Sequence, residues 1–174
     1  MFDKIQLIDE RIINWVGKLH TPKRNKLMIF FSKLGDKGLV WFAICAPFLI
    51  NKSTRGFGCN ILVGLVLTHL AGEILIKHLV CRIRPCHKLE EDQLIIKKPK
   101  YYSFPSGHTA SSFSVFSVAL FQFTPLAIPL FVLAVMISFS RLYLRVHYLT
   151  DIIAGAVLGS LCGFLAVELF KTIT

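Results

Sequence analysis

Three short polar clusters interrupt an otherwise apolar chain of 174 residues, and their side chains are of types that hold anions and transfer protons. The first cluster is KHLVCRIRP, in which Lys77 and Arg84 are seven residues apart. This spacing is two helical turns, so the two cations would share one helix face and converge on one anion. Pro85 is expected to end that helix. The alternative for this cluster taken alone is that both side chains extend to the lipid headgroups.

The second cluster is FPSGHTAS, which stands directly before a long apolar run. Ser106 follows Pro105 and is a favoured N-cap, so Gly107 and His108 should occupy the first helical turn. Backbone N–H groups there have no intrahelical partners, and with the helix dipole they form an anion site. His108 would lie beside that anion, where an acid can protonate a departing oxygen. An ordinary capped helix with an interfacial histidine would explain the serine but not the histidine.

The third cluster is SRLYLRVHYLTD, in which Arg141 closes one helix and His147 opens the next. Asp151 follows His147 at i, i+4, so its carboxylate would accept a hydrogen bond from one imidazole nitrogen. The other ring nitrogen then keeps its lone pair, and such an imidazole is a nucleophile or a general base. The alternative is a structural ion pair that fixes two helices.

Long apolar helices must position these clusters. Hydrophobic residues make up 54% of the chain and the mean hydropathy is +0.61, whereas soluble domains are about 45–50% apolar. We therefore predict an all-α membrane protein, a bundle of five to six transmembrane helices forming a single membrane domain over residues 1–174. The segment 27–34 is too short to span by itself and either joins the N-terminal helix or re-enters from the surface. The expected spans are 39–50, 56–80, 106–123, 125–143 and 147–170.

The N-terminal segment 1–20 has apolar residues at helical spacing and charges mostly elsewhere. This pattern predicts an amphipathic helix, which either lies along the bilayer surface or packs on the bundle. Acidic residues among its bases and the lack of an unbroken apolar stretch argue against a cleaved signal peptide.

The arrangement of the spans decides which polar residues meet. If the helices alternate across the membrane, all three clusters lie on one face. Gly155, Gly159 and Gly163 are spaced every four residues and predict a close helix-packing seam.

Taken together the clusters read K-x6-RP, PSGH and SR-x5-H-x3-D, in that order. This combination resembles the type-2 phosphatidic acid phosphatase (PAP2) family of membrane phosphatases, whose active site is similar to that of the vanadium haloperoxidases. The resemblance covers about residues 36–170, which would form the phosphatase helical core.

The resemblance implies a role for each matched residue. His147 would attack phosphorus and form a phosphohistidine, Asp151 would orient His147, and His108 would protonate the leaving group. The phosphoryl oxygens would be bound by Lys77, Arg84, Ser106, Gly107 and Arg141.

Four further residues are expected to support the site. The resemblance implies that Pro85, Pro105 and Ser140 serve the backbone or lie behind the phosphate-binding residues. Glu73 precedes Lys77 by one helical turn and would hold this lysine in position. A simple charge-neutralising pair within the membrane is the alternative.

No metal or other cofactor is expected. Guanidinium, ammonium and backbone N–H groups can stabilise the charge of a phosphoryl transition state. Glu90, Glu91 and Asp92 are contiguous and indicate a solvated loop rather than a cation site.

The expected partners are a membrane lipid phosphate and the bilayer, with no nucleic acid. The loop 86–102 is the sizeable stretch able to cover the site, and Lys97, Lys98 and Lys100 within it would attract a diphosphate headgroup or bind anionic lipids. Small members of the family resemble bacterial enzymes acting on undecaprenyl diphosphate, phosphatidylglycerophosphate or phosphatidate. Undecaprenyl diphosphate is the favoured substrate.

Two arguments about orientation conflict. Basic residues crowd the catalytic side, which by the positive-inside rule places it in the cytoplasm. The resemblance implies the extracytoplasmic side, and we adopt that expectation.

Other function classes are a vanadate-dependent oxidation, a lipid phosphotransferase and a non-catalytic lipid-phosphate binding or transport module. The presence of both His108 and His147 argues against the last.

Overall fold

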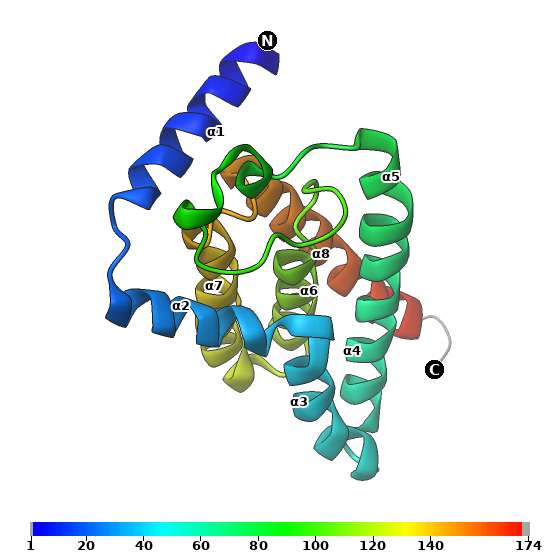
Figure 1. Ribbon diagram of the computed structural model, residues 1–174. Helices are drawn as coiled ribbons and strands as arrows, with labels where there is room; N and C mark the ends of the chain where they lie inside the picture. The colour runs from blue at the N-terminus through cyan, green and yellow to red at the C-terminus, as the bar shows by residue number, and fades with distance from the viewer. Residues whose placement is uncertain (1, 172–174) are drawn as a thin grey trace.

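The computed structural model describes residues 2–171, which fold as a bundle of helices (Figure 1). No strand occurs in this part of the chain, so the all-α prediction is confirmed. A π-helix, His69–Ile76, joins α4 to α5 into one continuous helical rod. The helices are α1 Phe2–Gly17, α2 Pro22–Leu34, α3 Leu39–Ile50, α4 Arg55–Thr68, α5 Lys77–Val80, α6 Gly107–Gln122, α7 Ala127–Tyr143 and α8 Leu149–Lys171. Single-turn 3-10 helices lie at Asp36–Gly38, Pro85–Lys88, Glu91–Gln93 and Thr124–Leu126.

Three segments within the described residues are long and apolar enough to cross a membrane: Arg55–Lys88, Thr124–Tyr143 and Leu149–Lys171. The other two predicted spans are helical but shorter. α3 has 12 residues and α6 has 16, whereas a hydrocarbon core requires about 20. At 1.5 Å per residue α3 is about 18 Å long. The predicted count of five to six transmembrane helices is therefore not confirmed.

Helix α6 is central and packs against α8, α7 and α4. Its contact with α8 follows the glycine seam that the sequence predicts. A Cβ on Gly159 would collide with the backbone of Ala110, and one on Gly163 would collide with the carbonyl oxygen of Ser114. Small residues on both helices thus let the two backbones approach closely, as is typical of membrane helices.

Two apolar cores hold the molecule together. The larger core joins α3, α4, α6, α7 and α8, and its buried members include Trp41, Ile61, Val115, Val118 and Ile137. The second core attaches α1 and α2 to the end of α7 and the loop after it, and includes Ile13, Val16, Met28, Tyr143 and Tyr148.

The two N-terminal helices form a bent arm beside the bundle (Figure 1). Ile13 and Val16 pack the inner face of α1 on the bundle, while Leu7, Ile8 and Trp15 remain exposed. Helix α2 begins at Pro22, before the predicted segment 27–34, because the Thr21 side chain caps it by accepting the N–H of Arg24 and Pro suits the first helical position.

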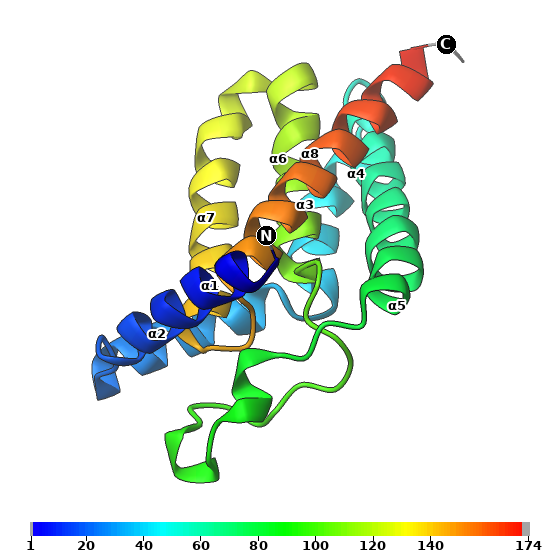
Figure 2. The same cartoon turned by 90° about the horizontal axis from the view of Figure 1, so that it is seen from above.

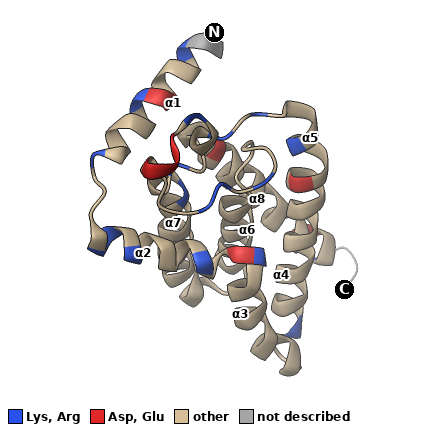
Figure 3. Cartoon of the chain, viewed as in Figure 1, with Lys and Arg blue, Asp and Glu red and all other residues tan. Residues whose placement is uncertain are grey.

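The loops 81–106 and the N-terminal arm gather at one end of the bundle, and the tight turn between α6 and α7 lies at the other (Figure 2). Figure 3 shows that the charged residues are concentrated in these loops and the arm, whereas α6, α7 and α8 contain few of them. The three polar clusters therefore meet on one face, as the alternating arrangement predicts.

Candidate active site

A cavity of about 1160 Å³ opens at this end of the bundle. Its walls come from α2, α3, α4, the π-helix, the start of α6, the end of α7 and the adjoining loops. The loop lysines Lys97, Lys98 and Lys100 line it, together with seven of the predicted catalytic, phosphate-binding and supporting residues: Glu73, Lys77, Arg84, Gly107, His108, Arg141 and His147.

The first cluster reaches the cavity in a way that the sequence did not predict. Helix α5 ends at Val80, where Cys81 adopts a left-handed conformation with φ of 50°, and Arg84 is extended. The prediction that Lys77 and Arg84 share a helix face up to Pro85 is therefore wrong. The extended segment is held by a backbone hydrogen bond from the N–H of Ser103 to the carbonyl of Arg82, 2.7 Å long. The two cations converge because the chain turns, not because of helical spacing.

Arg84 connects the loop to the predicted nucleophile. Its Nε donates to the Tyr101 carbonyl at 3.0 Å and its Nη1 donates to the Val146 carbonyl at 3.0 Å. Nη1 also lies 2.9 Å from Nε2 of His147. A guanidinium can only donate, so Nε2 presents its lone pair and the ring proton belongs on Nδ1. This is the tautomer that places the lone pair on Nε2, as an attack by that nitrogen requires.

His147 is buried, and its pKa is lowered well below the usual histidine value. Burial is the main cause, followed by the positive charges of Arg84 and Arg141. The imidazole is consequently neutral at physiological pH. Its Nδ1 lies 3.5 Å from Asp151 Oδ2, just beyond a normal hydrogen bond, and has no hydrogen-bond partner among residues 2–171.

Asp151 lies in the first turn of α8. The helix begins at Leu149, so His147 precedes it and the predicted span 147–170 starts two residues too early. Asp151 Oδ2 accepts the N–H of Tyr148 at 2.9 Å, which satisfies the backbone at the helix start. The N-terminus of α8 thereby fixes the carboxylate next to the imidazole.

Ser106 takes the N-cap position of α6, as predicted, but its side chain makes no capping hydrogen bond. It does not line the cavity. Its Oγ accepts from Thr109 at 3.0 Å and its N–H donates to the Asp151 carbonyl at 3.0 Å. Gly155 of α8 packs closely on the Ser106 carbonyl. Ser106 is therefore buried under α8 and does not reach the cavity.

The predicted pairing of Glu73 with Lys77 is present at 2.6 Å. The Glu73 carboxylate also lies against Gly107, where any Cβ would collide with it. Glycine at this position therefore allows a charged group to approach the first turn of α6.

His108 has a partner that sequence reasoning missed. Its Nε2 lies 3.0 Å from Asp36 Oδ1. The hydrogen bond from His108 lowers the pKa of the Asp36 carboxyl. The sequence signal for this contact was the polar stretch GDKG, residues 35–38, which separates two apolar segments. In the structure this stretch is a turn, and Lys37 and Gly38 in it have positive φ.

The remaining predicted residues surround the cavity rather than entering it, apart from Arg141. Arg141 Nη1 donates to the Ser32 hydroxyl. Ser140 Oγ donates to the Ile137 carbonyl of its own helix at 2.6 Å. Pro85 and Pro105 are both buried outside the lining.

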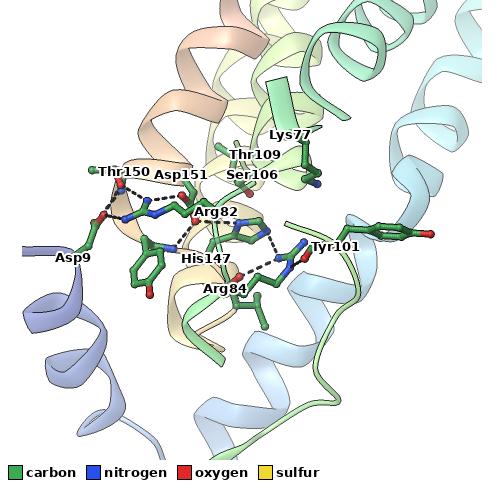
Figure 4. A network of polar contacts seen from close by, with 12 residues as sticks. Asp9, Lys77, Arg82, Arg84, Tyr101, Ser106, Thr109, His147, Thr150 and Asp151 are labelled. Atoms are coloured by element: carbon green, nitrogen blue, oxygen red, sulfur yellow. Dashed lines mark hydrogen bonds and ion pairs between the residues drawn. The ribbon is translucent and has the colours of Figure 1, made fainter. Parts of the chain in front are cut away.

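Arg82 and Asp9 were also missed. Arg82 forms ion pairs with Asp9 of α1 and with Asp151, behind the imidazole of His147 (Figure 4).

Within residues 2–171, no group of three or more His, Cys, Asp or Glu side chains is arranged to hold a metal ion. The donors that converge on the cavity are cationic, and cations suit an anionic ligand.

Residues 57–174 match the pattern of the PAP2 superfamily, and the chain belongs to this family. It is 37% identical to the undecaprenyl-diphosphatase of Sulfolobus acidocaldarius over 85% of this chain and 71% of that protein. It is 27% identical to phosphatidylglycerophosphatase B of Bacillus subtilis over 92% of this chain and 82% of that protein.

Two solved structures share the fold. The PAP2-type phosphatidylglycerolphosphate phosphatase of Bacillus subtilis superposes with a TM-score of 0.81 at 27% identity, covering 98% of this chain and 88% of that one. Aquifex aeolicus LpxE gives 0.77 at 25% identity, covering 91% and 93%. The protein is thus a membrane lipid phosphatase, a phosphoric ester hydrolase of the PAP2 type.

Proposed function

We propose that the protein removes the terminal phosphate of undecaprenyl diphosphate through a phosphohistidine on His147. The observation that carries this proposal is the composition of the cavity, which joins a strongly cationic region to an apolar wall. The undecaprenyl-diphosphatase relative of Sulfolobus acidocaldarius supports it.

The charge of the cavity favours a polyanionic headgroup. Two acidic residues, Asp36 and Glu73, contribute to the lining and are already paired with His108 and Lys77. A diphosphate carries more negative charge than a monophosphate and gains more from this excess of cations. The cationic lining residues are Lys33, Lys37, Lys77, Arg84, Lys97, Lys98, Lys100 and Arg141.

The apolar wall suits a lipid tail. It lies on α3, α4 and the π-helix, where Phe42, Val66 and Leu70 are exposed. A polyprenyl chain lying there would stay in hydrocarbon while its headgroup enters the cationic region. The apolar side chains are Phe42, Leu62, Leu65, Val66 and Leu70.

The reaction proceeds in two displacements. His147 Nε2 attacks the terminal phosphorus, a P–N bond forms, and the P–O bond to undecaprenyl phosphate breaks as His108 donates a proton to the leaving oxygen. Water then attacks the phosphohistidine, gives a proton to His108 and releases inorganic phosphate. Lys77, Arg84 and Arg141 stabilise the oxygens of each transition state, so the reaction needs no metal ion.

Orientation and domain organisation belong to the same proposal. The whole chain acts as one membrane domain, with the cavity on the extracytoplasmic side. The family resemblance supports this orientation.

The decisive experiment compares phosphate release from undecaprenyl diphosphate, phosphatidylglycerophosphate and phosphatidate in detergent with excess EDTA. Wild type and His147→Ala are assayed side by side. We expect release to survive EDTA, to be fastest with undecaprenyl diphosphate and to vanish in the variant. Release by His147→Ala would refute the phosphohistidine, whereas faster release from either glycerolipid would refute the substrate.

A further inference from the structure

We propose that Arg82, anchored by Asp9 of α1, is a positioning residue that fixes the carboxylate of Asp151 against His147. The inference rests on the proposed roles of His147 and Asp151. Arg82 does not line the cavity, so it acts through Asp151 and not on the substrate.

The guanidinium of Arg82 is bound on two sides (Figure 4). Nη1 donates to Asp151 Oδ1 at 2.6 Å and to Thr150 Oγ1 at 2.7 Å. Nη2 donates to Asp9 Oδ2 at 2.7 Å and to Gln6 Oε1 at 2.8 Å. The planar fork therefore joins α1 to the first turn of α8 with a fixed geometry that a lysine would not provide.

Its position is further fixed by an aromatic ring. The guanidinium carbon lies 4.0 Å from the ring centroid of Tyr148, the residue directly after His147. A cation over an aromatic face is stabilised by the ring quadrupole. The guanidinium thus lies against the loop that carries the nucleophile.

Two buried carboxylates meet at the start of α8. Asp9 is 1% exposed and Asp151 is 0% exposed. Each accepts a backbone N–H of this helix terminus: Asp9 Oδ1 from Thr150 at 3.2 Å, and Asp151 Oδ2 from Tyr148 at 2.9 Å. Two adjacent buried anions are costly without a counter-charge, and Arg82 supplies it to both.

The two carboxylate oxygens of Asp151 have different partners, and this difference bears on catalysis. Oδ1 is held by Arg82, which leaves Oδ2 facing His147 Nδ1 at 3.5 Å. Oδ2 also accepts the N–H of Tyr148, so two contacts set the rotation of the carboxylate, and one of them is lost without Arg82. The orienting acceptor of the imidazole is then held less firmly, which lowers the rate of the chemical step more than it weakens substrate binding.

The test uses the full-length protein in detergent, with undecaprenyl diphosphate as substrate and kcat and KM measured separately. The variants are Arg82→Gln, Arg82→Lys and Asp9→Asn. Glu10→Gln and Lys88→Gln are matched controls, since Lys88 and Glu10 form a second ion pair between α1 and the same loop, 2.8 Å long, in which neither Arg82 nor Asp151 takes part. Thermal stability is recorded for every variant.

For Arg82→Gln we expect kcat to fall about 30-fold or more with KM within about twofold. Arg82→Lys, which keeps the charge, should recover part of this loss, and Asp9→Asn should lower kcat about three- to tenfold. Both controls should keep wild-type kcat. A stable Arg82→Gln with wild-type kcat would overturn the inference. Equal losses in Asp9→Asn and Glu10→Gln would also overturn it, because they would show that α1 docking alone matters.

His147→Ala in the same assay distinguishes a failure of the phosphohistidine mechanism from a failure of the positioning role of Arg82. If His147→Ala stays active, the proposed mechanism fails, whatever Arg82→Gln does. If His147→Ala is inactive and stable Arg82 variants behave as wild type, the positioning role alone fails. Should Arg82→Gln not fold, Arg82→Lys and Asp9→Asn decide by the same kcat criterion.

Discussion

At the scale of single residues, the state of His147 follows from its neighbours. Arg84 faces Nε2 and has no acceptor, so the lone pair of the imidazole lies on the cavity side. Asp151 faces Nδ1 from the opposite side. The neutral state and the tautomer of the imidazole follow from these neighbours, and both are what the proposed nucleophile requires.

This state predicts the pH dependence of the reaction. Protonated His147 cannot attack, so kcat/KM should fall as pH decreases through the pKa of His147 in the free protein. Because burial and Arg84 lower that pKa, the acid limb should lie below 6.5, the usual value for histidine. The pH profile of kcat/KM checks this, with the substrate's own titration measured by phosphorus NMR. An acid limb above 6.5 that the substrate does not explain would contradict the assignment.

At the scale of elements, the close pairing of α6 and α8 aligns the second and third clusters. Ser106 and Asp151 lie at the starts of these helices and are joined by a backbone hydrogen bond of 3.0 Å. The glycine seam sets the distance between the helices, so it also sets the distance between the residues at their ends.

Widening this seam should destabilise the protein. In Gly159→Ala the new Cβ would meet the Ala110 backbone, which cannot yield as a side chain does. We expect a loss of about 1–3 kcal/mol of stability, as in other overpacked interfaces. Thermal unfolding in detergent measures it. Gly56→Ala is the control, since its nearest neighbour is one side-chain atom of Phe170 at 3.4 Å. Equal unfolding temperatures for the two variants would contradict the claim that close packing of α6 on α8 requires glycine at position 159.

At the scale of the whole molecule, distant segments contribute the charge of the cavity. The loop 86–102 supplies Lys97, Lys98 and Lys100, while the turn after α2 supplies Lys37. These cations surround a shared opening, so their effects on a polyanion add.

Removing loop charge should therefore discriminate between substrates. In the triple variant Lys97→Gln, Lys98→Gln, Lys100→Gln, we expect KM for undecaprenyl diphosphate to rise about tenfold and KM for phosphatidate about two- to threefold. Lys23→Gln with Lys26→Gln is the control, as neither residue lines the cavity. Michaelis–Menten kinetics at fixed salt measure both. Equal increases for the two lipids would show that the loop attracts lipid anions in general.

Membrane orientation is testable through Cys81, which is exposed within the first cluster, whereas Cys59 is half-buried and Cys45, Cys86 and Cys162 are buried. If the cavity faces outward, a membrane-impermeant maleimide should label intact cells, and Cys81→Ser should abolish this labelling. Permeabilised cells provide the positive control. Labelling of Cys81 after permeabilisation alone would place the cavity in the cytoplasm.

The local sequence pattern determined the positions of the core helices and several of the residues that line the cavity. Apolar runs and turn residues predicted the helices of the core to within a few residues, and three motifs predicted six residues that line one cavity. These features depend on near neighbours in the chain, where periodicity and capping chemistry operate.

Tertiary structure decided the contacts between distant segments. Arg82 meets Asp9 across 73 residues of sequence and His108 meets Asp36 across 72, while the left-handed turn at Cys81 brings Arg84 to His147. No local periodicity encodes such pairs, because they depend on where loops turn and on which buried charges need a counter-ion once the helices have packed.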